Sequence, residues 1–364
     1  MNKLKLLLFF FIASGTSNAQ DIRVQEPIKN FEKLWKEFND RYSFFELKNI
    51  DWQESYDKYR PLINNSTSND SLFTVCERML NELKDGHVSL VQFNKDKTVF
   101  RENVPAYEDL FRKNFPISEK EEPNIYQLLN LTDLTLEQYG FGKYINKKTG
   151  IIKYKVSSDY GYVTIRAMHG QPKKAFISDI DNALKAFNNK KGAIIDIRLN
   201  GGGDGDIAFE IAGRFADKQR IAHFMKERIK GTNEFKKIET TYILPKGKTQ
   251  FTKPIVLLTS DWTASAAEEF TLAMRELPYV TIVGDNTDGM LSDQYGFSLP
   301  NKWKVTLSHQ QYYSADMVNY EGVGIPPDFK LLNQPEDLLN GADPLIEKAI
   351  ELLKEKTNAN NGNR

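Results

Sequence analysis

The chemistry that this sequence could perform starts with a serine, Ser265, which stands between alanines just after a short apolar run. The pattern predicts a buried strand over residues 254–259 and a helix over residues 264–277, so Ser265 falls at the first turn of that helix. The positive end of a helix stabilises negative charge developing on a nucleophile, and small neighbours leave the hydroxyl open. Ser265 is therefore a candidate nucleophile. The alternative is that Ser265, or Thr263, only caps the helix.

A glycine-rich turn follows a second predicted buried strand, over residues 193–197, and reads NGGGD at residues 200–204. Glycines permit positive φ and leave backbone N–H groups uncovered, so such a loop can hold an anion. Ligands bind beyond the carboxyl ends of the strands in α/β sheets. We therefore expect Gly202, Gly203 and Ala266 to direct N–H groups into one oxyanion hole, worth ~3–4 kcal/mol.

A nucleophilic serine needs a base, and the chain has four histidines: His87, His169, His223 and His309. His87 leaves a predicted helix just before a strand, where it can face a neighbouring domain. His169 lies on a predicted strand-to-helix loop and is the second candidate. His223 and His309 fall on predicted strands, where we expect surface or edge positions. These residues by themselves leave the choice of base open.

Composition narrows the classes of function. Among 364 residues, 49 Lys and Arg balance 49 Asp and Glu, so no excess of cations favours nucleic acid as a partner. A single cysteine, Cys76, excludes an internal disulfide, a cysteine zinc site and an iron–sulfur cluster, and its place on an apolar helix stripe predicts burial. Asp204 and Asp206 are too few for a calcium site. We expect no metal and no cofactor.

The first residues read as a secretory signal peptide. Lys3 and Lys5 precede an apolar run over residues 6–13, and small residues lead to Ala19, where we expect cleavage. That run is shorter than the ~20 residues that span a bilayer, and no later stretch is long and apolar enough. The sequence thus predicts export to the periplasm or the extracellular space, without a membrane span.

The elements that must position these residues follow from periodicity. Apolar residues at helical spacing over residues 27–83 predict a helical bundle, and alternating strands and helices from residue 151 predict an α/β core with a largely parallel sheet. Residues 221–225 and 237–243 predict an inserted hairpin. The predicted segments are a signal peptide (1–19), an N-terminal helical bundle (20–86), a strand and connecting region of unassigned fold (87–150), an α/β catalytic domain (151–352) and a disordered tail (353–364).

Several motifs, in this order, resemble those of the C-terminal-processing (tail-specific) serine proteases and the related core of tricorn protease. They are LKDGH at 83–87, YGYV at 160–163, DIR with NGG at 196–202, TASAAE at 263–268, VGD with Thr287 and Gly289 from 283, and EGVGIPPD at 321–328. The resemblance weakens between residues 94 and 149. It implies a mixed α/β fold with a ClpP/crotonase-like core, without an inserted PDZ domain, and hydrolysis of polypeptides, especially unstructured or C-terminal segments.

Two catalytic arrangements occur among such proteins. One is a Ser-Lys dyad, but Met290 holds the lysine position here and cannot accept a proton. The resemblance to tricorn instead implies that His87 is the base and that Glu321 orients it, the logic of any Ser-His-acid triad. One departure is Gly86, which stands where the tricorn-like site has a serine.

The sequence therefore predicts an exported serine endopeptidase with Ser265, His87 and Glu321 as its triad. Asp196 and Arg198 are expected to brace the end of a strand rather than to react. Two alternatives stay open: a non-catalytic protein that binds peptides or apolar ligands on the same fold, and an esterase with the same triad. The sequence does not give the oligomeric state.

Overall fold

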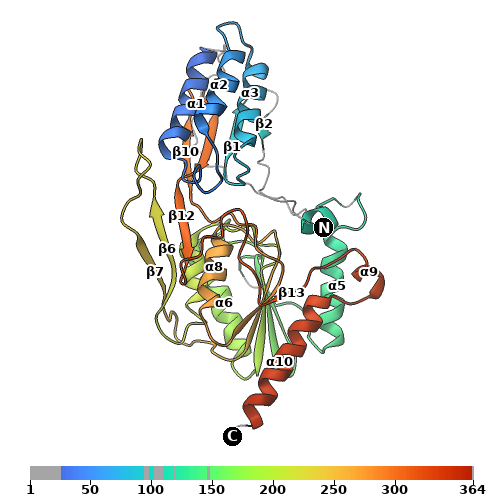
Figure 1. Cartoon of the computed structure of the whole chain (residues 1–364). Helices are drawn as coiled ribbons and strands as arrows, with labels where there is room; N and C mark the ends of the chain where they lie inside the picture. Colours follow the sequence, from blue (N-terminus) through green and yellow to red (C-terminus); the bar gives the residue numbers. More distant parts are fainter. Residues whose placement is uncertain (1–25, 94–97, 102–109, 119, 146–147, 363–364) are drawn as a thin grey trace.

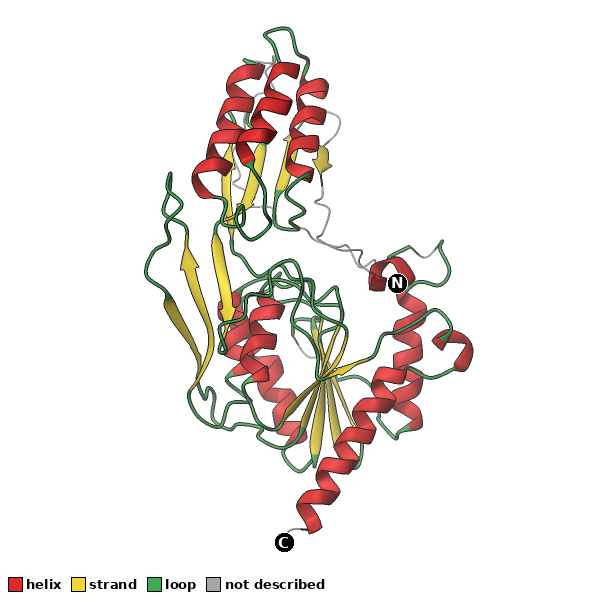
Figure 2. Cartoon of the chain, viewed as in Figure 1, coloured by secondary structure: helices red, strands yellow, loops and turns green. Residues whose placement is uncertain are grey.

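The structure is a computed structural model that describes residues 26–93, 98–101, 110–118, 120–145 and 148–362. The predicted signal peptide lies outside the described residues. A smaller N-terminal unit of helices and strands stands above a larger α/β core (Figure 1). Secondary structure alternates along the core in the way that the apolar periodicity predicts (Figure 2).

The core is built on a six-stranded sheet with the order β13-β9-β8-β5-β4-β3. Neighbouring strands run parallel from β13 to β4, and β3 is antiparallel to β4. The strands are β3 (Ile152–Val156), β4 (Tyr160–Ile165), β5 (Gly192–Asp196), β8 (Ile255–Thr259), β9 (Val280–Gly284) and β13 (Phe329–Lys330). All residues of β5 and β8 are buried, as expected for strands covered on both faces. The predicted mixed α/β fold with a largely parallel sheet is confirmed.

Helices cover both faces of this sheet (Figure 1). One face carries α6 (Lys173–Phe187), α7 (Gly205–Ala212) and α8 (Ala266–Arg275), and the other carries α5 (Ile125–Gln138) and α10 (Pro344–Gly362). The expected disordered tail from residue 353 needs correction, because α10 continues to residue 362. Leu353 is fully buried and Thr357 is 9% exposed, so an apolar stripe packed on the sheet holds this segment in helical form.

The N-terminal unit is not formed by the first part of the chain alone. Its helices are α1 (Pro27–Arg41), α2 (Trp52–Tyr59), the short 3₁₀ helix η1 (Arg60–Leu62) and α3 (Asn69–Asn81). They pack on a sheet of order β10-β11-β1-β2, made of β10 (Gln294–Ser298), β11 (Lys304–Ser308), β1 (Ser89–Phe93) and β2 (Thr98–Arg101). Trp303 and Leu307 lie in the same apolar core as Phe31 and Leu34. The predicted boundaries of a bundle at 20–86 and a catalytic domain at 151–352 therefore need correction, because β10 and β11 complete the N-terminal unit.

A three-stranded sheet joins the two parts, with β6 (Arg220–Glu227) between β12 (Gln310–Ser314) and β7 (Glu239–Ile243). The predicted hairpin is β6 with β7. The expectation that His223 lies at the surface is wrong: it is 2% exposed, between the rings of Phe209 and Tyr312, and burial lowers its pKa to about 4. Two short helices, α4 (Leu110–Asn114) and α9 (Asp337–Asn340), complete the described elements. No helix in the described part of the chain is long and apolar enough to cross a bilayer.

Candidate active site

Ser265 occupies the sharp turn between β8 and α8. Its backbone has φ 56° and ψ −126°, a positive φ that only glycine adopts without strain. Thr263 does not cap this helix, because its hydroxyl donates to the carbonyl of Ile197 and accepts the N–H of Ser260. The serine is partly exposed while Ala264 and Ala266 are buried. A serine held out on a strained strand-to-helix turn is the geometry of a nucleophile elbow.

The glycine loop lies against this turn. A Cβ on Gly202 would lie 2.8 Å from the Ser265 Cβ and 2.9 Å from the Ala266 nitrogen, so only glycine permits this approach. The Gly202 N–H, however, donates to Asn200 Oδ1 at 2.9 Å, which removes it from the predicted oxyanion hole. Within the described part of the chain, no hydrogen bond takes up the N–H groups of Gly203 and Ala266. These two donors remain for an oxyanion.

Glu268 joins the serine turn to the loop that follows β9. Its carboxylate accepts the N–H of Ser265 at 3.0 Å, and it also accepts from the Thr287 hydroxyl, the Gly289 N–H and the Met290 N–H at 2.6–2.8 Å. Burial raises the pKa of Glu268 to about 7. The four hydrogen bonds favour the charged form and so lower this pKa, but burial has the larger effect. The sequence carried a signal for this residue, since S-x-x-E is the spacing of a capping box.

His87 lies in the N-terminal unit, between α3 and β1, and is 3% exposed. Its backbone N–H donates to Asp85 Oδ1 at 2.8 Å, and its carbonyl accepts from the Thr306 hydroxyl of β11. The Nδ1 atom is buried without a hydrogen-bond partner among the described residues. Burial lowers the pKa of His87. Among the neighbouring groups that raise this pKa, Asp85 has the largest effect. An uncharged imidazole is the form that a general base requires.

Glu321 is 7% exposed and lies in the turn that precedes β13. One of its oxygens, Oε2, accepts the N–H of Leu291 at 3.1 Å. Burial and the neighbouring Asp85 raise the pKa of Glu321 well above its usual value, while Lys48 opposes them. The carboxyl group therefore favours its protonated form.

The loop over residues 287–293 connects these groups. Glu268 holds its first half to Ser265, Leu291 contacts Glu321, and the backbone of Ser292 contacts the His87 imidazole. The structure thus brings all three predicted triad residues to one loop. Among the described residues no hydrogen bond joins His87 to Ser265 or Glu321 directly, as is common before a substrate binds.

His169, the second candidate base, also lies close to this site. It follows Met168, which forms a bridge with Gly203, and a Cβ on Gly203 would lie 3.0 Å from the His169 Cβ. Burial lowers the pKa of His169 as well. His169 lies beside the glycine loop, whereas His87 lies at the loop over residues 287–293, so position alone leaves two candidate bases.

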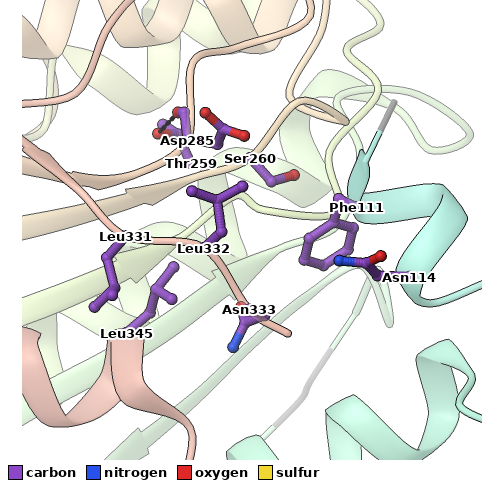
Figure 3. Close-up of a pocket in the computed structure, with 9 residues that line it drawn as sticks. All are labelled: Phe111, Asn114, Thr259, Ser260, Asp285, Leu331, Leu332, Asn333 and Leu345. Carbon is purple, nitrogen blue, oxygen red and sulfur yellow. Dashed lines mark hydrogen bonds between the residues drawn. The ribbon is translucent and has the colours of Figure 1, made fainter. Parts of the chain in front are cut away.

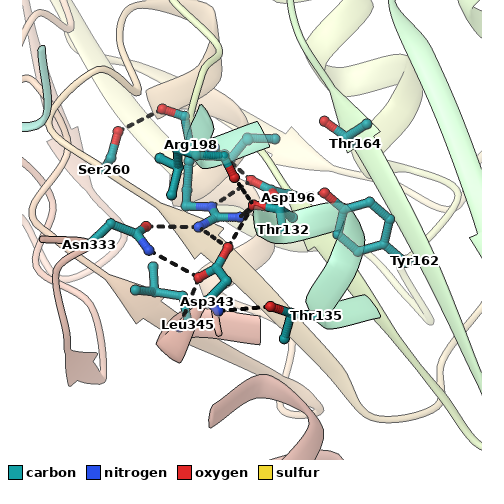
Figure 4. Close-up of polar contacts among 12 residues, drawn as sticks. Thr132, Thr135, Tyr162, Thr164, Asp196, Arg198, Ser260, Asn333, Asp343 and Leu345 are labelled. Atoms are coloured by element: carbon teal, nitrogen blue, oxygen red, sulfur yellow. Dashed lines mark hydrogen bonds and ion pairs between the residues drawn. The ribbon is translucent and has the colours of Figure 1, made fainter. Parts of the chain in front are cut away.

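Asp196 and Arg198 form a brace at the end of β5, as expected (Figure 4). The guanidinium donates to both Asp196 oxygens and to Asp343 at 2.7–3.1 Å, and it also binds Asn333. Burial pushes the Asp196 pKa upward, but Arg198, Arg166 and the hydrogen bond from Tyr162 together hold that pKa below its usual value. The brace ties β5 to the start of α10.

A pocket beside this brace does not contain the triad (Figure 3). Its lining includes Phe111, Ser260 and Asp285. The Ser260 hydroxyl donates to the Arg198 carbonyl, and Asp285 pairs with Lys330. Because these polar groups are already satisfied, the pocket offers no obvious reactive group. Nor does any group of three or more His, Cys, Asp or Glu side chains suited to a metal ion occur in the described ranges.

A serine on a strained turn at a helix N-terminus, with two N–H groups left free beside it, defines the site type of a serine hydrolase. The family comparisons agree with this class. Residues 159–331 match the model of peptidase family S41, and residues 23–81 match that of the tricorn protease C1 domain. Residues 159–331 are therefore similar to the peptidase domain of family S41, and residues 23–81 to the C1 domain of tricorn protease.

Relatives of known sequence and structure support this similarity. The carboxy-terminal-processing protease of Bartonella bacilliformis is 28% identical over 215 residues, which are 56% of this chain and 47% of that protein. Carboxy-terminal processing protease CtpA of Bacillus subtilis is 30% identical over 155 residues, 42% of this chain and 31% of that protein. The chain thus spans about half, or less, of these curated relatives. A protein of Parabacteroides merdae with a known crystal structure superposes with a TM-score of 0.74 at 29% identity, covering 90% of this chain and 97% of that one.

Proposed function

We propose that this protein is an exported serine endopeptidase that cleaves polypeptides, with unstructured or C-terminal segments as its substrates. The observation that carries the proposal is the turn at Ser265, where a strained serine meets the free N–H groups of Gly203 and Ala266. The S41 family match and the processing proteases among the relatives support peptide bonds as the target. Export rests on the signal-like N-terminal sequence.

In the proposed reaction, the Ser265 hydroxyl oxygen attacks the substrate carbonyl while His87 takes its proton. The oxyanion that forms is bound by the N–H groups of Gly203 and Ala266, an interaction worth ~3–4 kcal/mol per donor in comparable sites. Collapse of this intermediate transfers the proton from His87 to the leaving amine and leaves an acyl-enzyme. Water then attacks the ester, with His87 again as the base, and releases the second product. Glu321 orients His87 in this scheme.

The test is Ser265→Ala, assayed for cleavage of casein and for labelling by a fluorophosphonate probe. We expect both to be lost while the thermal unfolding midpoint stays close to that of the wild type, because alanine keeps the same Cβ on the turn. Labelling of wild-type protein at another residue, or full cleavage by the variant, contradicts the assignment. A p-nitrophenyl ester assayed in parallel separates a peptidase from an esterase, and binding of peptides without turnover indicates a binding protein.

A further inference from the structure

A cluster of buried ionisable side chains lies behind His87. Asp85, whose side chain is fully buried, is two residues before the histidine, and its Oδ2 atom lies 3.7 Å from the Lys48 ammonium. The Tyr42 ring is also completely buried, and Asp85 and Glu321 both face its hydroxyl. The cluster therefore contains two carboxyl groups and one cation. Two adjacent buried carboxylates cannot both stay charged at low cost beside a single cation.

The hydrogen bonds show which carboxyl group keeps the charge. Asp85 accepts from the His87 N–H at 2.8 Å and from the Ser308 hydroxyl at 3.1 Å, and it faces the Lys48 ammonium as well. Glu321 accepts only the Leu291 N–H in the described part of the chain. Donors stabilise the charged form of a carboxyl group, so Asp85 carries the negative charge and Glu321 the proton. The raised pKa of Glu321 agrees with this division.

Lys48 also holds the segment that presents His87. Its ammonium donates to the carbonyls of Leu83 and Lys84 at 3.2 and 3.0 Å, at the end of the turn after α3. Lys48 therefore binds the backbone before Gly86, and Asp85 binds the backbone N–H of His87 after it. A small movement of either group would move the imidazole relative to Ser265, and misplacement of about 1 Å can cost ~10²-fold in rate.

We propose that Asp85 is a positioning residue of the active site, which fixes the backbone of His87 and supplies the negative charge that faces its imidazole in the free enzyme. This inference rests on the proposed function in so far as His87 is the base. It differs from the expectation drawn from the sequence, in which Glu321 supplies the negative charge beside His87. Glu321 remains a neutral hydrogen-bonding group, which accepts the N–H of Leu291.

The other groups around the imidazole do not change this assignment. Asp293, which is exposed, also raises the pKa of His87, but less than Asp85 does. Lys48 lowers that pKa. Around Glu321 the charged or titratable neighbours are Asp85, Lys48 and Glu268, with Tyr42 beside them. Because Asp293 is in solvent, its effect is screened by salt, whereas that of buried Asp85 is not.

The test is an NMR titration of the His87 imidazole in Ser265→Ala protein labelled on histidine, with His87→Ala identifying the signal among the four histidines. Asp85→Asn keeps an oxygen for the His87 N–H but removes the charge, so the titration midpoint should fall. Lys48→Met removes a cation, so the midpoint should rise. Glu321→Gln replaces a neutral group by another and should leave the midpoint in place. Shifts of opposite sign in the first two variants are not expected from a general loosening of the fold.

A midpoint that falls in Glu321→Gln and stays in place in Asp85→Asn overturns the inference. If Asp85→Asn does not fold, Lys48→Met and Glu321→Gln still decide the question, because both leave the Asp85 carboxylate in place. The acidic limb of kcat/KM, measured with Ser265 restored, separates this result from the proposed function. Should the NMR midpoints move as expected while the limb does not follow them, His87 is not the base, although Asp85 still governs its charge.

Discussion

The side chain of Met290 fills the space beside the Cα of Gly86: a Cβ on that glycine would lie 2.0 Å from the methionine sulfur and 2.9 Å from its Cε. These are the two positions at which the sequence departs from the two known catalytic arrangements. Met290 stands in place of the dyad lysine, and Gly86 in place of the tricorn-like serine. Because a side chain at position 86 would overlap Met290, the methionine at position 290 requires a glycine at position 86.

The first prediction follows from this contact. Gly86→Ser should lower activity, because the new side chain must displace Met290 from the loop that links Ser265 to Glu321. Met290→Ala opens the space and keeps the N–H that Glu268 binds. The double variant should therefore recover much of the activity that Gly86→Ser loses, and a double-mutant cycle on kcat/KM measures the coupling. Additive effects of the two changes would show that the contact does not matter.

The choice of base gives the second prediction. His87→Ala should lower kcat/KM by ~10²–10⁴-fold, the usual contribution of a general base. His169→Ala is the matched control, since His169 is a half-buried histidine that lies close to the glycine loop. It should leave the rate nearly unchanged. The reverse pattern would transfer the role of base to His169.

A third prediction concerns stability against pH. Burial and the nearby acids Asp293, Asp204 and Asp206 raise the pKa of Glu269 to about 8 from 4.5. The folded state therefore binds this proton more tightly than the unfolded state, so the free energy of unfolding falls as pH rises from about 4.5 to 8. Glu269→Gln, which is always neutral, should lessen this fall. Urea unfolding of both proteins at pH 5 and pH 8.5 measures this fall. An equal fall in the free energy of unfolding for the wild type and Glu269→Gln would contradict the prediction.

The fourth prediction concerns the brace at the end of β5. Arg198→Met should destabilise the protein by ~3–5 kcal/mol, because it leaves the buried carboxylates of Asp196 and Asp343 without their cation. Adding Asp343→Asn should return part of this loss. Chemical unfolding measures both variants. A loss below ~1 kcal/mol for Arg198→Met would mean that the buried ion pairs contribute little.

The sequence alone was sufficient for the features that depend on local pattern. Strands and helices of the core follow from their apolar periods, and Cys76 is fully buried as its place on a helix stripe predicts, with burial raising its thiol pKa to about 12. The strand-to-helix turn at Ser265 and the neighbouring glycine loop were predicted for the same reason. Each consists of a strand end, small residues and a helix start within a few positions of one another.

Only the tertiary structure decided the features that depend on residues far apart in the chain. Strand β11 pairs with β1 across more than two hundred residues, and no local pattern in either segment names its partner. The burial of His223 depends on the ring of Tyr312 in β12. The helical form of the chain after residue 353 depends on the face of the sheet on which α10 packs. The same holds for Asp85, whose partners Lys48, Ser308 and Glu321 come from three separate segments. Pairing across the chain depends on the total packing of the fold, whereas periodicity reports only which face of a segment is apolar.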